Sequence, residues 1–156
     1  MPREARLVLD NMCYHIITHG NGGQVIFRDD EDYRKYLRLL ARYKEKYGFK
    51  LYGWCLVNPS VYLVMESDSL SKVVHGINLS YAQYFNNKHE RTGYFWHDRF
   101  ESYTIQKDSY LINCILYVEY NPVRTKIVQR PEDYQWSSYR ARVLGGRDSL
   151  LDFLFL

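Results

Sequence analysis

The order of two hydrophobic periodicities constrains the fold of this chain more than any other feature. Runs of β-forming residues alternate with stretches whose apolar residues recur every three or four positions, as on one face of a helix. From the N-terminus the order is strand, helix, strand, strand, helix, strand, helix. This order predicts an α+β fold, a ferredoxin-like split βαβ sandwich with helices on one face of an antiparallel sheet.

Local signals place the expected elements along the chain. A glycine cluster at 20–23 ends the first strand, and Gly48 ends the first helix. Asn58-Pro59-Ser60 is expected to form the short turn of a central hairpin, and Pro122 to end the third helix. The expected strands cover residues 14–19, 49–57, 61–66 and 94–106. The expected helices cover residues 30–47, 69 or 71 to about 87, and 108–122.

The length of 156 residues fits one compact domain. We therefore expect a single domain over residues 1–156, with an apolar tail at 147–156 that docks on its own domain or on a partner chain, so a homodimer is plausible. No stretch approaches the roughly 18 apolar residues of a membrane span, and no secretion signal is visible at the N-terminus, so we expect no membrane contact and a cytoplasmic location.

Charge and aromatic content allow contact with nucleic acid without requiring it. The formal net charge is +3, far below that of an obligate nucleic-acid coat, but 17% of the residues are aromatic. One segment interleaves basic and aromatic side chains, which suits phosphate contact and base stacking together. Its candidate DNA-binding residues are Lys88, Arg91, Trp96, Arg99 and Lys107. The basic residues of the first helix fit an ordinary solvated face better.

Tyr117 stands apart from the apolar stripe of its helix. At 100° per residue it lies about 120° from the stripe of Leu111, Ile115 and Val118, and Asn113 and Asn121 fall near its own direction. Tyr117 is therefore expected to leave the core between two amides. A boundary tyrosine bonded to solvent or backbone would give the same pattern, so the spacing alone does not decide its role.

Five segments, taken in order, resemble the REP-associated tyrosine transposases, members of the single-tyrosine HUH superfamily. They are Tyr14-His15-Ile16-Ile17-Thr18-His19-Gly20-Asn21, Ile26-Phe27-Arg28-Asp29-Asp30-Glu31-Asp32, Trp96-His97-Asp98-Arg99-Phe100, Leu116-Tyr117-Val118-Glu119-Tyr120-Asn121-Pro122-Val123-Arg124, and Pro131-Glu132-Asp133-Tyr134-Gln135-Trp136-Ser137-Ser138-Tyr139. The similarity spans residues 12–146, and the family's ferredoxin-like fold agrees with the order of elements above.

The resemblance implies a transposase that cleaves and rejoins single-stranded or hairpin DNA during transposition. In that family a tyrosine, here Tyr117, attacks a phosphodiester and becomes joined to the 5′ phosphate, while Mg²⁺ or Mn²⁺ polarises the phosphate. The metal is held by two histidines that flank one hydrophobic residue, and by a polar side chain one turn past the tyrosine. Asn121 matches that last position.

This sequence departs from the family at the two histidines. Ser60 and Tyr62 occupy their positions, and a neutral hydroxyl and a neutral phenol are much weaker ligands of these cations than imidazole or carboxylate. Either the metal site is lost or other residues rebuild it. The candidates for rebuilding are His15, His19, His97 and Glu66, each of which fits an ordinary structural role as well.

Three functions remain open from the sequence. The first is a transposase-family protein that binds single-stranded or hairpin DNA with impaired metal-dependent catalysis. The second is an active transposase with a rebuilt metal site. The third is a non-catalytic regulator that binds RNA or DNA on its sheet.

Overall fold

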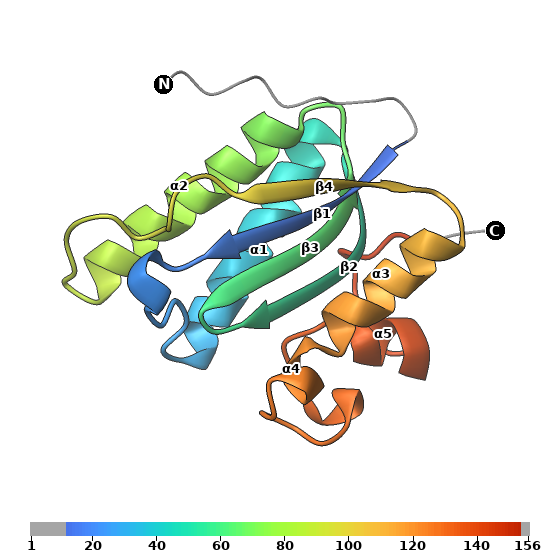
Figure 1. Cartoon of the computed structure of the whole chain (residues 1–156). Coiled ribbons are helices and arrows are strands. Elements are labelled where there is room, and N and C mark those ends of the chain that lie inside the picture. Colours follow the sequence, from blue (N-terminus) through green and yellow to red (C-terminus); the bar gives the residue numbers. More distant parts are fainter. Residues whose placement is uncertain (1–11, 154–156) are drawn as a thin grey trace.

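A four-stranded antiparallel sheet forms the centre of the computed structural model, which describes residues 12–153 (Figure 1). The sheet order is β2-β3-β1-β4, so the first strand lies between the third and the fourth. The strands are β1 (Met12–His19), β2 (Lys50–Val57), β3 (Ser60–Glu66) and β4 (Glu101–Gln106). The expected α+β fold with an antiparallel sheet is confirmed.

The two faces of the sheet carry different residues because side chains alternate along a strand. On β1, Tyr14 and Ile16 point into the larger core. His15 and His19 belong to the opposite set, where His15 lies beside Tyr103 of β4, and His19 beside Ser60 of β3. The pairing register therefore gathers His15 and His19 of β1 with Ser60 and Tyr62 of β3 on one face.

Helices α1 (Asp30–Tyr47) and α2 (Leu70–Lys88) pack together over one face of the sheet (Figure 1). The caps of α1 match the sequence signals: the Asp29 side chain accepts from the Asp32 amide at 3.0 Å, and Gly48 has a φ of 71° at the C-terminal end. The layer covers a core that includes Tyr36, Leu40 and Tyr81.

Helix α3 (Ser109–Glu119) packs on the opposite face, so the expectation of helices on one face only needs correction (Figure 1). Its Leu111, Ile115 and Val118 form a second core with apolar residues of the sheet. Gly53 of β2 allows this approach, because a Cβ there would lie 3.0 Å from Ile115 Cγ2. A one-sided sandwich is the simplest packing of the element order, but it leaves the second sheet face bare.

Two further boundaries differ from those expected. The fourth strand begins at Glu101 rather than at residue 94, because Phe95 and Trp96 turn inward and pack on Tyr81. Pro122 does not end helical structure: α3 stops at Glu119, and the short helix α4 (Asn121–Arg124) follows with Pro122 in its first turn.

The C-terminal part of the chain folds back on the sheet. This part contains the 3-10 turn Pro131–Asp133 and the helix α5 (Tyr139–Leu144). Near the other end of the chain, a 3-10 turn at Asn21–Gly23 follows β1. Leu150 and Leu151 are buried, and the Asp152 amide donates to the Leu51 carbonyl at 2.8 Å. Residues 154–156 of the expected apolar tail lie outside the described residues. No helix in the described part of the chain is long and apolar enough to cross a membrane.

Candidate tyrosine site and nucleic-acid interface

Tyr117 leaves the core, as its helical position predicts, and 55% of it is exposed. The ring lies edge-on to the imidazole of His15, with centroids 6.4 Å apart. The guanidinium carbon of Arg124, from the end of α4, lies 3.7 Å from the centroid of the Tyr117 ring. A phenol open to solvent, an imidazole and a guanidinium therefore meet at the C-terminal end of α3.

His15 links this tyrosine to the sheet. Its ring stacks on Tyr62 at 6.3 Å and lies 6.2 Å from Tyr103. Nε2 of His15 is buried, with no hydrogen-bond partner among the described residues. Burial lowers the pKa of His15 and nearby Arg124 lowers it further, against the opposing effect of Glu101. The imidazole is therefore neutral at neutral pH.

Ser60, at the first expected metal position, belongs to a hydrogen-bonded chain across three strands. Ser60 Oγ lies 2.6 Å from His19 Nδ1, and His19 Nε2 lies 3.1 Å from Glu101 Oε2. Tyr103 donates its hydroxyl to Glu101 Oε1 at 2.8 Å. Ser60 itself is only 3% exposed. The Ser60 hydroxyl is therefore already hydrogen-bonded and is shielded from solvent on this face of the sheet.

The residues at the expected metal positions do not fit a divalent cation. Ser60 is buried against His19, Tyr62 is a neutral phenol in an aromatic stack, and Asn121 is buried at the start of α4. Mg²⁺ and Mn²⁺ favour carboxylate and other hard oxygen ligands, and these three supply no charge.

The candidates for a rebuilt site do not converge. Glu66 forms an ion pair with Lys107 and accepts from Tyr52 at 3.2 Å. His97 is exposed and follows Trp96, and its backbone amide donates to the His19 carbonyl at 2.8 Å. Among the described residues, neither joins His15 or His19 in a group of three metal-ligating side chains.

Three potential metal ligands meet elsewhere, at the N-terminus of α1 and the C-terminus of α2. Ligand atoms of Asp29, Asp32 and His89 lie within 4.8 Å of one another. The Lys88 ammonium already sits between these carboxylates, 2.9 Å from Asp29 Oδ2 and 3.0 Å from Asp32 Oδ1. The lysine supplies the positive charge that a cation would bring, so the group fits an ion-pair cluster built around the buried Asp32.

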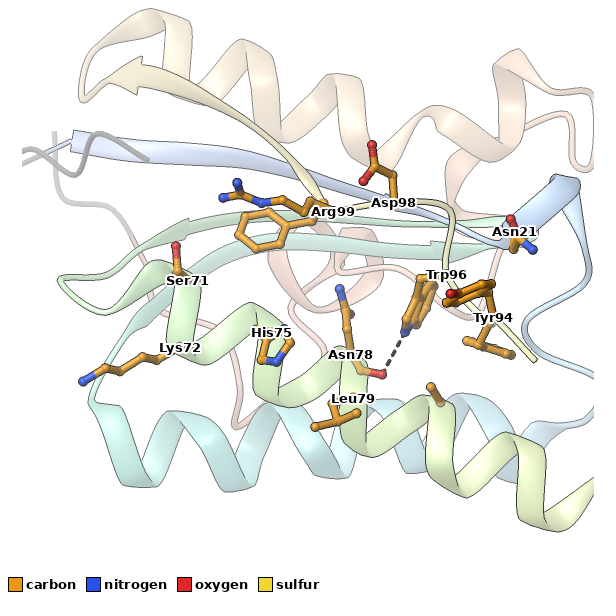
Figure 2. Close-up of a pocket in the computed structure, with 13 residues that line it drawn as sticks. Asn21, Ser71, Lys72, His75, Asn78, Leu79, Tyr94, Trp96, Asp98 and Arg99 are labelled. Carbon is orange, nitrogen blue, oxygen red and sulfur yellow. Dashed lines mark hydrogen bonds between the residues drawn. The ribbon is translucent and has the colours of Figure 1, made fainter. Parts of the chain in front are cut away.

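A cavity of about 1010 Å³ lies between α2 and the segment that leads into β4 (Figure 2). Figure 2 shows Lys72 and His75 along α2, with Tyr94, Trp96 and Arg99 on the other side. Trp96 is held in place because Nε1 donates to the Asn78 carbonyl at 2.8 Å. Most of the wall is apolar or aromatic, with basic groups at its rim. Such a surface can take up flat bases beside a charged backbone.

The five candidate DNA-binding residues have different surroundings. Trp96 and Arg99 line the cavity, and Arg91 Nη2 donates to the Tyr94 carbonyl at 2.7 Å beside it. Lys88 and Lys107 form ion pairs, with Asp29 and Asp32 for Lys88 and with Glu66 for Lys107. Three of the five residues therefore gather at one surface.

Some residues at these two sites escaped the sequence reasoning. Lys72 and His75 line the cavity, but they lie on α2, far in sequence from the aromatic cluster. In the sequence, Arg124 stands out only as the last residue of a segment that resembles the family. Its spacing of seven residues from Tyr117, about two helical turns, was the signal that could have placed it above the ring.

Comparison with solved structures identifies the class of fold. The structure of a REP-associated tyrosine transposase bound to a REP hairpin matches with a TM-score of 0.74 and 14% identity, over 100% of both chains. A putative transposase from Deinococcus radiodurans R1 aligns at 17% identity with a TM-score of 0.46, over 76% of this chain and 96% of that one. The first match shows the fold of a tyrosine transposase.

The family follows from the sequence match. The model of the IS200-like transposases matches residues 8–121, well over half of the chain. The chain belongs to the IS200-like transposase family. No curated protein matches it significantly.

Proposed function

We propose that this protein binds DNA hairpins with a single-stranded flank, and that its metal-dependent strand cleavage is impaired. The observation that carries the proposal is the contrast between Tyr117 and Ser60, the residues at the expected nucleophile position and at one expected metal position. Tyr117 is exposed, whereas Ser60 is buried and hydrogen-bonded to His19 at 2.6 Å where the family resemblance places a metal ligand.

DNA binding needs only charge and stacking surfaces. The cavity beside α2 offers an exposed aromatic ring, Tyr94, and basic groups from Lys72 and Arg99. A single strand can place bases against such a wall and phosphates at its rim. The solved relative with this fold is described as bound to a REP hairpin, which supports hairpin DNA as the ligand here.

Cleavage needs more than binding. A phenol with an ordinary pKa of about 10 is a poor nucleophile at neutral pH unless a base or a metal assists it. Ser60, Tyr62 and Asn121 bring no charge to a cation, and even the loss of a single preorganised hydrogen-bond donor from an active site typically costs about 10²–10³ in rate. We therefore expect Tyr117 to react slowly with DNA even in the presence of Mn²⁺.

One observation favours the second candidate, an active transposase. His19 and Glu101 keep 41% and 46% of their side-chain surfaces exposed, so both remain open to an incoming ion. Two such ligands could hold a cation weakly if the strand supplied a phosphate oxygen. The experiment below separates the two candidates.

The test uses the purified full chain with a DNA hairpin that carries a single-stranded flank. Gel shift in EDTA measures binding, and a denaturing gel after incubation with Mn²⁺ measures the covalent protein–DNA adduct. We expect a shift and little or no adduct. An adduct that forms readily and disappears in Tyr117→Phe selects the active transposase.

Two controls complete the test. An RNA hairpin of the same sequence is bound less tightly if DNA is the ligand, and equal or tighter RNA binding favours the regulator. Arg42→Ala, on the solvent face of α1, is a matched control for changes in charge. Absence of binding to either hairpin refutes the proposed function.

A further inference from the structure

We infer that Arg124 binds a phosphate of the DNA strand directly beside Tyr117, and so supplies the positive charge at this site. This inference rests on the proposed DNA-binding function and names the group that holds the backbone at the tyrosine. It concerns binding of a phosphate and includes no chemical step.

The position of the guanidinium carries the inference. Its carbon lies over the Tyr117 ring, 3.7 Å from the centroid and well inside the roughly 6 Å of a cation–π contact. Stacking engages the face of the guanidinium plane and leaves its N–H donors, which lie at the edges of that plane, free to bind another group. Arg124 and Tyr117 are both exposed, so the donors of the guanidinium are open to solvent beside this tyrosine.

The ionic surroundings of Arg124 leave its charge available. Among the described residues, no carboxylate lies within ion-pair distance of Arg124, whereas Arg142 on the nearby α5 is paired with Glu119. The charge acts on its surroundings, since it lowers the pKa of His15. An unpaired guanidinium beside an exposed phenol is matched in charge and geometry to the two oxygens of a phosphodiester.

The backbone fixes this arrangement. The Tyr120 carbonyl accepts from the amides of Val123 and Arg124, both at 3.0 Å, so α4 continues closely from α3. Arg124 therefore lies about two turns beyond Tyr117 and above its ring. His15 supports the ring from the side of the sheet. A phosphate bound here would lie between the edge of the guanidinium and the phenol oxygen.

The first test measures the affinity for the hairpin with a single-stranded flank by fluorescence anisotropy in EDTA, over a range of salt concentrations. We expect Arg124→Ala to weaken binding about tenfold or more, the usual effect of losing a charge-assisted hydrogen-bonded contact. The slope of log K against log salt should become shallower by about 0.7, as expected for one lost phosphate contact on a single strand. Arg124→Lys keeps the charge but loses the bidentate fork, so its affinity should lie between those of the wild type and Arg124→Ala.

A second test locates the phosphate. Single methylphosphonate substitutions remove the charge from one backbone position at a time in the flank. At the contacted position, the neutral linkage should weaken binding by the wild-type protein about tenfold and have no further effect in Arg124→Ala. Methylphosphonate substitutions at other positions should weaken the binding of the wild type and of Arg124→Ala equally.

Controls separate the possible failures. Arg42→Ala removes the same charge from an exposed surface helix, so it should bind nearly as well as the wild type. If Arg124→Ala binds with wild-type affinity and salt slope, the inference is wrong while the proposed function stands. If the wild type binds no hairpin at all, the proposed function itself fails.

Discussion

An ion pair between Glu119 and Arg142 anchors the helix that carries Tyr117. The Glu119 side chain is fully buried, and the Arg142 side chain is 21% exposed. Arg142 Nε lies 3.1 and 3.0 Å from the two carboxylate oxygens, and Ser138 donates its hydroxyl to Glu119 at 2.6 Å. Replacing Arg142 by Ala would leave a buried carboxylate with only a neutral donor.

The cost follows from the burial of the two partners. Removing one partner of a buried pair typically costs about 3–5 kcal/mol. Because Arg142 is partly exposed, water can enter the space that it leaves and solvate the carboxylate, so we expect the lower end, about 3 kcal/mol. For a chain of this size, each kcal/mol lowers Tm by about 2–4 °C, which gives a decrease of about 6–12 °C.

Urea denaturation followed by circular dichroism measures this free energy of unfolding. Arg140→Ala is the matched control, because Arg140 lies on the same helix and, among the described residues, its side chain donates only to the Glu132 carbonyl, at 2.7 Å. The control should cost less than about 1 kcal/mol. Equal losses for Arg142→Ala and Arg140→Ala would refute the idea that this pair anchors α3.

The remaining predictions concern the ion cluster, the packing of α3 and the cavity. Although burial alone would raise the pKa of Asp32, hydrogen bonds from the Arg28 amide, Lys88, His89 and Tyr84 hold it below the ordinary 3.8. The ionised Asp32 therefore stabilises the folded state above pH 3.8, and this stabilisation is lost as the pH falls below that value. The free energy of unfolding of Asp32→Asn, measured over the same acid range, should not show this loss. Gly53→Val should cost about 1–3 kcal/mol in urea denaturation because it overpacks Ile115, and an unchanged midpoint would contradict the close approach. Tyr94→Ala should weaken binding of the single-stranded flank by about 1–3 kcal/mol in anisotropy titrations, and no change would exclude stacking on this exposed ring.

Sequence reasoning worked best where one local signal decided the outcome. The bounds of α1 follow from the Asp29 cap, the apolar spacing and Gly48. The sequence pattern predicts too long a fourth strand, because the segment from Tyr94 alternates like a strand although β4 begins at Glu101. Its Phe95 and Trp96 instead pack on Tyr81, a contact between distant parts of the chain that no local pattern reveals. The packing of α3 on the second face of the sheet is likewise a contact between distant parts of the chain, which local patterns do not reveal.

The candidate site could be predicted only in part for a similar reason. The exposure of Tyr117 follows from helical periodicity, which depends on one element. The link from Ser60 to His19 and on to Glu101 depends on the register of three strands. The family resemblance predicts that Ser60 takes the position of a histidine, but only the structure reveals that the Ser60 hydroxyl is buried.

Charge at the tyrosine site connects the two proposals. The residues at the expected metal positions, Ser60 and Tyr62, are both neutral. The Arg124 guanidinium lies over the Tyr117 ring and has no carboxylate partner among the described residues. A single guanidinium can hold a phosphodiester against a phenol, because binding needs one complementary charge and a surface. Cleavage also requires stabilisation of the charge that develops on the phosphate and the leaving oxygen. If both proposals hold, Arg124→Ala should lower the affinity for the strand far more than it lowers the amount of adduct formed per bound strand.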